Sequence, residues 1–407
     1  MRGGTAGSRL LREEDAVALD PRIPYTVRPY TVGSHGVRPY TVGSHAVSPD
    51  TTGSPGVGQD VVGSHADGPE GIGADVSDSD PAGPGAPVAA KTGSPVSRWR
   101  RDLLPAALGV LTAASLACHR WLPDPGFGLR SLGESLLPWS GVPALGLLLW
   151  AALRRAPAVA CAGGAAALVW GAMFGPLLTA AQGPDASGGP GGPQGGAGLT
   201  VVTHNVLADN RDPAGTARAL LAAHPDLVAL QEVTEPAWRP YREVLGAELP
   251  HHISTGTVGL WSRYPLTEAG RLIIDPGWNR SLRAEVQAPF GPLAVYVAHL
   301  QSVRPHLSGF VTGQRDGNIA ELGRAVEAER LPRVLVLGDL NTAPDDHALA
   351  PLTDRLTLAR DGFGFTWPAA FPVARIDHVL TRELNASTWT LPATGSDHLP
   401  LAGRIRP

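Results

Sequence analysis

The stretch VLVLGDLNTAPDD, residues 334–346, carries carboxylate and amide side chains directly after an apolar run. An apolar run of this length that ends in polar residues is typical of a buried strand that reaches the edge of a sheet. The polar residues indicate either a site at that edge or the cap of a following helix. Asp345 and Asp346 precede a further apolar segment, and we interpret them as the first residues of a helix. Asp339 and Asn341 are left as candidates for a site.

Polar side chains stand at the ends of other apolar runs between residues 199 and 407. These residues are Asn205 after LTVVTH, Glu232 after LVALQ, His299 after AVYVA, Asp377 between ARI and HVL, and Asp397 with His398 before LPLAGRI. Carboxylate and amide oxygens suit Mg²⁺ or Mn²⁺ better than zinc. A histidine near an aspartate is a typical general base. Together these groups indicate metal-assisted hydrolysis of a phosphate ester.

Two further histidines are neighbours of candidate residues. His204 precedes Asn205, and His378 follows Asp377. Side chains alternate between the two faces of a strand, so both histidines should point away from the candidate site. We therefore predict structural roles for both.

Composition divides the chain into regions. Residues 1–97 contain a ten-residue repeat (VRPYTVGSHG, VRPYTVGSHA, VSPDTTGSPG, VGQDVVGSHA) and few large apolar side chains, which predicts a disordered tail. Residues 183–198, GPDASGGPGGPQGGAG, predict a flexible linker. Residues 199–407 are an ordinary length for one core, and short β-like runs with interspersed helices predict an α/β sandwich.

Residues 98–182 contain three apolar stretches long enough to cross a bilayer, namely Leu103–Leu122, Leu136–Leu153 and Pro157–Ala181. Arginines precede the first stretch and separate the second from the third (Arg98, Arg100, Arg101, Arg154 and Arg155). The positive-inside rule places both arginine clusters in the cytoplasm, which predicts a multi-pass protein of the cell membrane with a cytoplasmic N-terminus and an extracellular C-terminal domain. Three buried helices of a soluble protein are the alternative.

Charge and cysteine content exclude several classes of protein. The formal net charge is −4 and the pI is about 6.3, so the chain is not a basic nucleic-acid binder. The two cysteines, Cys118 and Cys161, lie in apolar stretches, which excludes a disulfide framework and a cysteine-based metal cluster.

The pieces THNV, LQEV, AHL, GDLN, RIDHV and SDHLP occur in this order across residues 199–407. In sequence and order they resemble the endonuclease/exonuclease/phosphatase (DNase I-like) superfamily. The resemblance implies a four-layered α/β/β/α sandwich and a metal-dependent hydrolase of phosphate esters. It also implies a metal site for Mg²⁺ or Mn²⁺, in which Glu232 is the primary carboxylate, Asn205 lies beside it, and Asp397 is a further carboxylate.

The same resemblance implies a catalytic role for each remaining residue of the matching pieces. Asp339 would position or activate the attacking water, and Asn341 would hold the phosphate. His398 would be the general base or an electrostatic partner, oriented by Asp377. His299 would contact the scissile phosphate or assist the leaving group.

The substrate is less constrained. The C-terminal domain contains no lysine, which disfavours a nuclease, since nucleic-acid binding depends on lysine and arginine contacts to phosphates. The layout resembles the actinobacterial teicoplanin-resistance membrane proteins, which implies a lipid-linked substrate such as undecaprenyl pyrophosphate. The alternatives are a membrane-tethered extracellular nuclease, a sphingomyelinase-like phosphodiesterase, and a non-catalytic membrane-anchored binding module. Arg280, Arg283 and Arg315 are candidates to bind the substrate phosphate through bidentate contacts.

Overall fold

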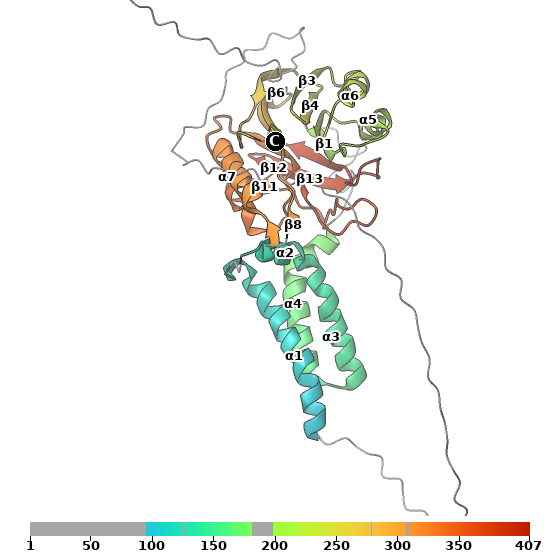
Figure 1. Ribbon diagram of the computed structural model, residues 1–407, viewed down its shortest axis with the longest axis vertical. Helices are drawn as coiled ribbons and strands as arrows, with labels where there is room; N and C mark the ends of the chain where they lie inside the picture. Colours follow the sequence, from blue (N-terminus) through green and yellow to red (C-terminus); the bar gives the residue numbers. More distant parts are fainter. Residues whose placement is uncertain (1–94, 124–125, 181–197, 278, 307–308) are drawn as a thin grey trace, which may run out of the picture. The chain divides into compact units, whose positions relative to one another are not determined.

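The computed structural model describes residues 95–123, 126–180, 198–277, 279–306 and 309–407. The predicted disordered tail and linker lie outside these ranges, apart from residues 95–97 and 198. Among the described residues, the C-terminal domain contains two six-stranded sheets and a short two-stranded hairpin (Figure 1).

The first sheet has the strand order β13-β14-β1-β2-β4-β3. Its strands are β1 (Leu199–Asn205), β2 (Leu227–Gln231), β3 (His251–Thr255), β4 (Val258–Ser262), β13 (Asn385–Thr390) and β14 (Leu401–Arg406). Helices α5 (Pro213–Leu221) and α6 (Trp238–Leu245) contribute to one apolar cluster with β1, β2 and β4, and they cover the outer face of this sheet.

The second sheet has the order β11-β12-β10-β7-β6-β5. Its strands are β5 (Leu266–Arg271), β6 (Ser281–Ala288), β7 (Gly291–His299), β10 (Val334–Asp339), β11 (Thr357–Leu358) and β12 (Asp377–Arg382). Helices α7 (Gly313–Glu327) and α8 (Ala350–Thr353) pack on its outer face. The hairpin β8 (Arg304–His306) and β9 (Gly309–Val311) precedes α7, and the 3₁₀ turn η4 (His347–Leu349) precedes α8.

The main core lies between the two sheets, and strand alternation determines which residues enter it. On β10, Leu335 and Leu337 belong to the cluster shared by both sheets, whereas Val334 and Val336 pack against the helices outside. The layers therefore follow the order helix, sheet, sheet, helix. This order confirms the predicted four-layered sandwich for residues 199–407.

The N-terminal helices are α1 (Pro95–Cys118), α2 (Leu129–Ser135), α3 (Gly141–Arg154) and α4 (Pro157–Thr179), with 3₁₀ turns η2 (His119–Trp121) and η3 (Leu137–Ser140). In the described part of the chain, two helical segments are individually long and apolar enough to cross a membrane, Arg101–Trp121 and Pro157–Thr179. The second predicted stretch, Leu136–Leu153, is not one straight helix. It is part of a pair, Leu129–Ser135 and Leu137–Arg154, that bends by 62° and adds a third span only if the pair crosses as one. Pro138 lies at the start of η3, and the 14 residues of α3 span only about 21 Å.

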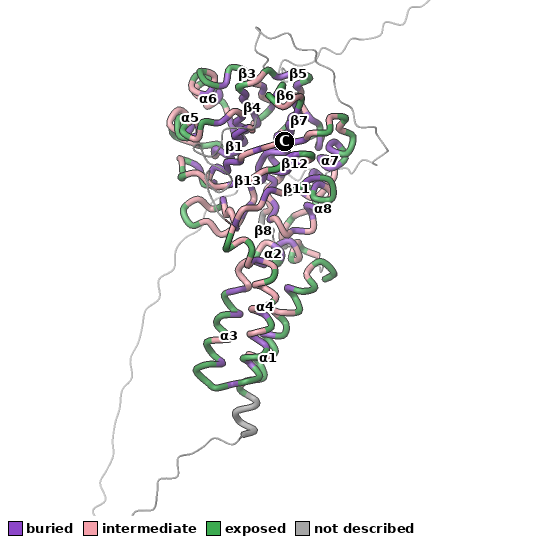
Figure 2. Tube along the Cα trace, turned by 180° about the vertical axis from the view of Figure 1, so that it is seen from behind, coloured by how far each residue is buried: buried purple, intermediate pink, exposed green. Residues whose placement is uncertain are grey.

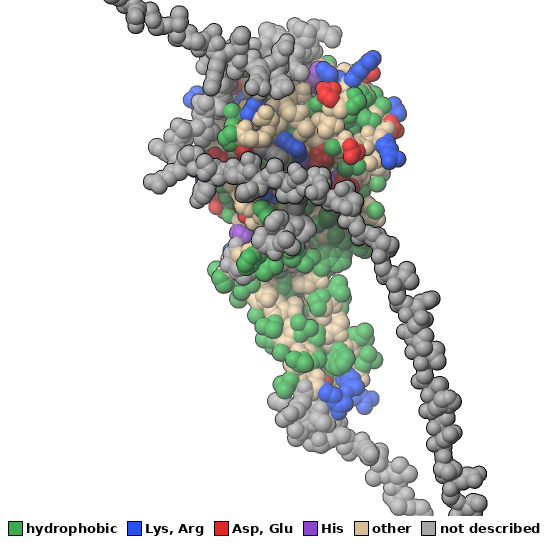
Figure 3. All heavy atoms as spheres, viewed as in Figure 1, with side chains coloured by type: hydrophobic (Ala, Val, Ile, Leu, Met, Phe, Trp, Pro, Cys, Tyr) green, Lys and Arg blue, Asp and Glu red, His purple; other side chains and the backbone are tan. Residues whose placement is uncertain are grey.

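Helices α1, α3 and α4 pack through small residues and leave many large apolar side chains exposed. Gly109 of α1 lies against Ala162 of α4, and Gly163 of α4 lies against Leu147 of α3. A side chain at either glycine would meet its neighbour within about 3.1 Å. Figure 2 shows buried positions concentrated in the sandwich, and Figure 3 shows hydrophobic side chains over the visible face of the helices.

Candidate active site

The carboxyl ends of parallel strands bring the first candidate residues to one edge of the sandwich. Asn205 is the last residue of β1, and Glu232 directly follows β2, which runs parallel to β1. In the other sheet, β7 and β10 are also parallel and end at His299 and Asp339, which pair in register. Alternation from Leu337 places Asp339 on the face between the sheets. The site thus begins where the inter-sheet core ends.

Two further residues reach this edge from antiparallel segments. Asp377 is the first residue of β12 and pairs in register with Asp339. His398 lies in the loop before β14, and the distance from its Nδ1 to Oδ2 of Asp377 is 2.8 Å. This bond holds the imidazole so that Nε2 faces the Asp339 carboxylate, 3.8 Å away. The pair therefore has the predicted arrangement of a histidine oriented by an aspartate.

Asp339 is the centre of the cluster. Nδ2 of Asn205 donates to Oδ2 of Asp339 at 3.0 Å. Nε2 of His299 lies 3.7 Å from the same oxygen and 3.6 Å from Oε1 of Glu232. Asn205, His299 and Asp339 are buried, whereas the side chain of Glu232 is 24 % exposed. The cluster therefore opens to solvent on the side of Glu232.

Unusual backbone conformations shape the site. Gly338 has φ +150°, and a Cβ atom there would lie 1.9 Å from the carbonyl oxygen of Ala298 on β7. Asn341 has φ 49°, and its backbone N–H donates to Oδ1 of Asp339 at 2.9 Å. Glu232 also has a positive φ, 60°. Left-handed conformations of non-glycine residues cost free energy and cluster at functional sites. The GDLN turn is thus fixed by close approach of β7 and by the Asp339 side chain.

Burial and like charge make Asp339 unusual among the carboxylates. The pKa of Asp339 is raised to about 7, mainly by burial and next by the negative charge of the neighbouring Asp377. Burial also acts upward on the pKa of Asp377, but the charge and hydrogen bond of His398 outweigh it, so that this pKa is lowered. The two carboxylates therefore differ in proton affinity, as is typical of paired acid and base groups.

The two histidines of the site have opposite shifts. Burial lowers the pKa of His398, but the charge and hydrogen bond of Asp377, with Asp339 and Asp397 behind them, raise it to about 10. Burial, and next the charge of Arg280, lower the pKa of His299 to about 3. Near neutral pH, His398 is thus an imidazolium and His299 is a neutral imidazole in the metal-free protein.

The donor set fits a divalent cation. Ligand atoms of Asp339, Asp377 and His398 all lie within 4.8 Å of one another, and the carboxylate oxygens of this cluster would bind the cation, since an imidazolium offers no lone pair. Glu232 offers a partly exposed carboxylate beside this group, which suits an ion that keeps some of its waters, as Mg²⁺ does. Asp397 is exposed, and its Oδ2 accepts a bond from Nε1 of Trp367 at 3.3 Å. It lies at the rim and is not one of the three clustered residues.

Of the three predicted phosphate arginines, the structure brings Arg280 to the site, where its Nη1 lies 3.3 Å from Nδ1 of His299. The prediction for Arg283 is wrong. Its guanidinium is buried, pairs with Glu329 at 3.0 Å and contacts Glu268, because alternation along β6 turns it toward the helix layer. This arginine neutralises a buried carboxylate.

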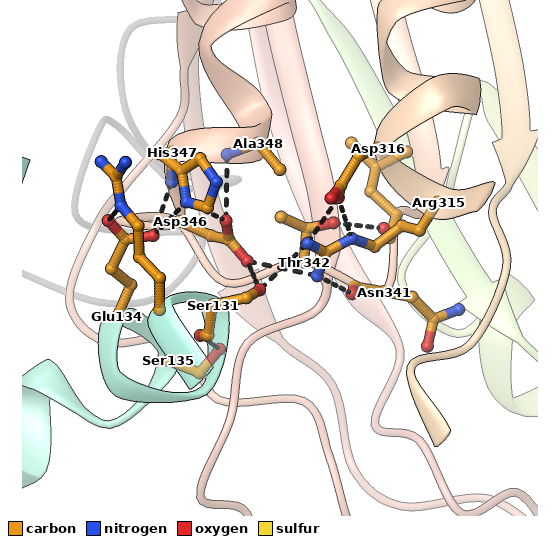
Figure 4. A network of polar contacts seen from close by, with 12 residues as sticks. Ser131, Glu134, Ser135, Arg315, Asp316, Asn341, Thr342, Asp346, His347 and Ala348 are labelled. Carbon is orange, nitrogen blue, oxygen red and sulfur yellow. Dashed lines mark hydrogen bonds and ion pairs between the residues drawn. The ribbon is translucent and has the colours of Figure 1, made fainter. Parts of the chain in front are cut away.

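The prediction for Arg315 is also wrong. Its guanidinium is buried on α7, where it pairs with Asp316 and Asp346 and donates to the hydroxyl of Ser131 on α2. Figure 4 shows this network, which joins α2 to the loop after β10. Nη1 of Arg315 also donates to the carbonyl oxygen of Asn341 at 3.3 Å. Arg315 therefore stabilises the turn behind the site and not the substrate.

Both outward-facing histidines are structural, as predicted. Nε2 of His204 bonds to the Thr394 hydroxyl at 2.9 Å, and Nε2 of His378 bonds to the Thr342 carbonyl at 2.7 Å. Asp346 is confirmed as an N-cap, since its Oδ1 accepts from the amide of Ala348.

Asp345 lies one residue before this N-cap, but its own carboxylate bonds elsewhere. Its carboxylate forms a bidentate pair with Arg360, at 2.8 and 2.7 Å. The partner is 15 residues away and was not recognised from the sequence.

Some supporting residues were also missed. The Ser396 hydroxyl donates to the carbonyl of Asn205 at 2.6 Å and accepts from the amide of His398 at 3.0 Å. It thereby connects the loop before β14 to β1. The Thr366 hydroxyl accepts from the backbone amide of Ile376, the neighbour of Asp377, at 3.4 Å, and its carbonyl accepts from the amide of Leu399 at 2.7 Å. Ser396 is part of the SDHLP motif, which was a signal for it, whereas nothing in the sequence indicated Thr366.

Comparison with known families agrees with this geometry. Residues 202–398, just under half of the chain, match the model described as Endonuclease/Exonuclease/phosphatase family. This segment contains every residue predicted to bind metal or to act in catalysis. Among curated proteins, none matches the chain.

Solved structures that resemble the chain include a beta toxin from Staphylococcus aureus, with 15% identity over 50% of this chain and 99% of that one and a TM-score of 0.43. Sphingomyelinase C from Streptomyces griseocarneus has 18% identity over 51% and 99%, with a TM-score of 0.41. An endonuclease/exonuclease/phosphatase from Beutenbergia cavernae has 19% identity over 52% and 72%, with a TM-score of 0.41. The family match and the assembled site define the domain as a metal-dependent hydrolase of phosphate ester bonds.

Proposed function

We propose that the protein is a membrane-anchored phosphohydrolase that acts, outside the cytoplasm, on a lipid phosphate such as undecaprenyl pyrophosphate. The observation that carries the proposal is the direct junction between apolar helices and the catalytic domain. Trp139 of η3 donates through Nε1 to the carbonyl of Val373 at 2.8 Å, and its ring stacks on Phe365 at 5.7 Å. A domain docked in this way on membrane helices would work at the lipid surface.

The helix packing supports the proposed orientation. Ala106 of α1 packs with Ala156 and Val159 at the turn between α3 and α4, so Arg101 and the arginines of that turn belong to one end of the bundle. Phe174, near the other end of α4, contacts Phe363 of the catalytic domain. With the arginines in the cytoplasm, the catalytic domain lies on the outer side.

The residues of the site have roles in the proposed reaction that follow from their charge states. Asp339, with a pKa near 7, is suited to accept the proton of an attacking water. The imidazolium of His398, held by Asp377, stabilises negative charge on the phosphoryl oxygens. Neutral His299 and cationic Arg280 lie side by side and can donate to the phosphate. A divalent cation held by Glu232, with Asn205 beside it, would polarise the phosphoryl group when bound.

The test compares two substrates with the full-length protein in detergent micelles. Phosphate release from undecaprenyl pyrophosphate and cleavage of plasmid DNA are measured with Mg²⁺ or Mn²⁺ and with EDTA. We expect metal-dependent phosphate release, which Glu232→Ala and His398→Ala each reduce by at least about 100-fold. Glu243→Ala is the matched control, because this carboxylate is exposed and pairs only with Arg239 among the described contacts.

Rapid plasmid cleavage without lipid phosphate turnover would replace the proposal with a tethered nuclease. Full activity of both site variants, folded as judged by their melting temperature, would overturn the site assignment. The orientation has a separate test, in which a C-terminal reporter active only in the cytoplasm is fused to the chain. We expect it to be silent, and strong reporter activity would contradict the extracellular placement.

A further inference from the structure

An apolar cavity of about 300 Å³ lies where the helices meet the catalytic domain. Its walls come from η3, α3, α4 and the segment between β11 and β12, and include Trp139, Leu145, Ala167, Trp170, Phe363 and Phe365. Val142 and Leu145 line the cavity and are exposed, so it opens to the outside of the helices. Hydrocarbon gains free energy when it leaves water for a space with apolar walls, so such a cavity would accept a hydrocarbon chain.

Hydrogen bonds and stacked rings hold the walls of the cavity in place. The indole of Trp170 donates to the carbonyl of Pro138 at 2.8 Å, as that of Trp139 does to Val373. Their polar atoms are thus satisfied, which leaves apolar ring surface to face the cavity. Phe363 and Phe365 stack on each other with ring centroids 5.3 Å apart.

The buried polar network of Figure 4 fixes the spacing between the helices and the domain. On α2, Ser131 contacts Asp346 and Arg315, and Glu134 accepts from both the amide and Nδ1 of His347. Separation of α2 from the domain would leave these buried charges without partners, so the network favours the docked position of α2. The turn η3, which follows α2, supplies Pro138 and Trp139 to the cavity.

The chain segment that forms one wall of the cavity continues to residues that bond beside the active site. Phe365 faces the cavity, while the next residue, Thr366, bonds through its hydroxyl to the amide of Ile376 and through its carbonyl to the amide of Leu399, the neighbours of Asp377 and His398. Adjacent Cα atoms are about 3.8 Å apart, so a ligand in the cavity lies close to the catalytic edge. Trp367 then bonds to Asp397, the neighbour of His398. The segment from Phe365 to Trp367 joins the two spaces.

We propose that this cavity binds the hydrocarbon chain of the lipid substrate while its phosphate occupies the active site. The inference rests on the proposed lipid phosphatase function. The hydrocarbon chain would enter the cavity from the bilayer, because Val142 and Leu145 of α3 line the cavity and are exposed. Binding of the chain here selects lipid phosphates over water-soluble phosphates, since only a hydrocarbon chain gains from leaving water for an apolar space.

The experiment compares two pyrophosphate esters of different chain length, farnesyl and isopentenyl pyrophosphate, with the full chain in detergent micelles and Mg²⁺. We expect kcat/KM to favour the longer chain by on the order of 100-fold. Ala167→Phe, which fills the cavity, should reduce this preference at least tenfold while leaving kcat/KM for the short ester within about twofold. Leu168→Phe is the matched control, because Leu168, the neighbour of Ala167 on α4, is 76% exposed and does not line the cavity.

If Ala167→Phe fails to fold, Leu145→Phe tests the same space from an exposed position on α3. An unchanged chain-length preference in a folded cavity variant, or no preference in the unmodified protein, would overturn the cavity assignment and leave the phosphatase proposal intact. Cleavage of plasmid DNA by a protein that hydrolyses neither of these esters and not undecaprenyl pyrophosphate would instead overturn the proposed function itself.

Discussion

Replacement of Asp377 by asparagine tests the electrostatic account of the site. In the metal-free protein the pKa of His398 is about 10, against an ordinary value of 6.5, and the Asp377 carboxylate is the first cause that opposes burial. Asparagine keeps the shape but removes the charge. We therefore expect the pKa of His398 to fall toward its ordinary value by more than about one pH unit, which corresponds to more than about 1.4 kcal/mol of interaction with the imidazolium.

The same shift predicts how stability depends on pH. The pKa of His398 is raised on folding, so its contribution to the free energy of unfolding is fully present below pH 6.5 and is lost as the pH rises through about 10. In Asp377→Asn this loss should be much smaller. The rate of phosphate hydrolysis at pH 7 should fall by about 10²- to 10⁴-fold, because the histidine loses both charge and orientation.

Histidine NMR in EDTA follows the pKa, and denaturant unfolding at pH 6 and pH 10 follows the stability. Asp212→Asn is the matched control, since Asp212 caps α5 away from the site and asparagine is an equally good cap. A pKa that stays near 10 in Asp377→Asn would refute the assignment of its cause. Wild-type activity in that variant would refute the role of the pair.

The other predictions concern the turn, the arginines and the metal. Gly338→Ala should lower the free energy of unfolding by more than about 3 kcal/mol, because Cβ would clash with the backbone of β7, and a melting temperature within two degrees of the original would contradict this. Arg280→Met should reduce kcat/KM at least about tenfold with little change in stability. Arg283→Met should instead lower the free energy of unfolding by about 3–5 kcal/mol and keep its activity per folded molecule. The opposite pattern would show that the two arginines were assigned the wrong roles. EDTA should abolish activity, and Mg²⁺ should restore it. In a Mg²⁺ titration, Glu232→Gln should raise the Mg²⁺ concentration needed for half-maximal activity at least tenfold. An unchanged Mg²⁺ concentration would exclude Glu232 as a metal ligand.

Local patterns accounted for much of the site. Apolar runs that end in a polar residue predicted strand ends, and alternation correctly separated Asn205 and Asp377 from their outward-facing neighbours His204 and His378. These inferences succeeded because the direction of a side chain within a strand depends on neighbours in the sequence. The order of the six motifs along the chain further pointed to one fold, the α/β/β/α sandwich.

Predictions that depended on distant partners failed. Arg283 finds Glu329 across 46 residues, and Arg315 finds Ser131 across 184 residues. A buried arginine and a substrate-binding arginine look alike in a sequence, since the difference lies in which carboxylate is nearby. The predicted second membrane span, Leu136–Leu153, falls in a helix pair that bends by 62°, so it stays a prediction that holds only if the bent pair is one span.

By itself the sequence determined the class of domain, the strand ends and the chemical groups at the site, because these follow from local periodicity and residue type. In the GDLN turn, sequence singled out Asp339 and Asn341. Only the tertiary structure gave Asp339 a pKa near 7, since that shift arises from burial and from Asp377 on another strand. The junction cavity, likewise, exists only because segments far apart in the chain, such as those with Trp170 and Phe365, form its walls together.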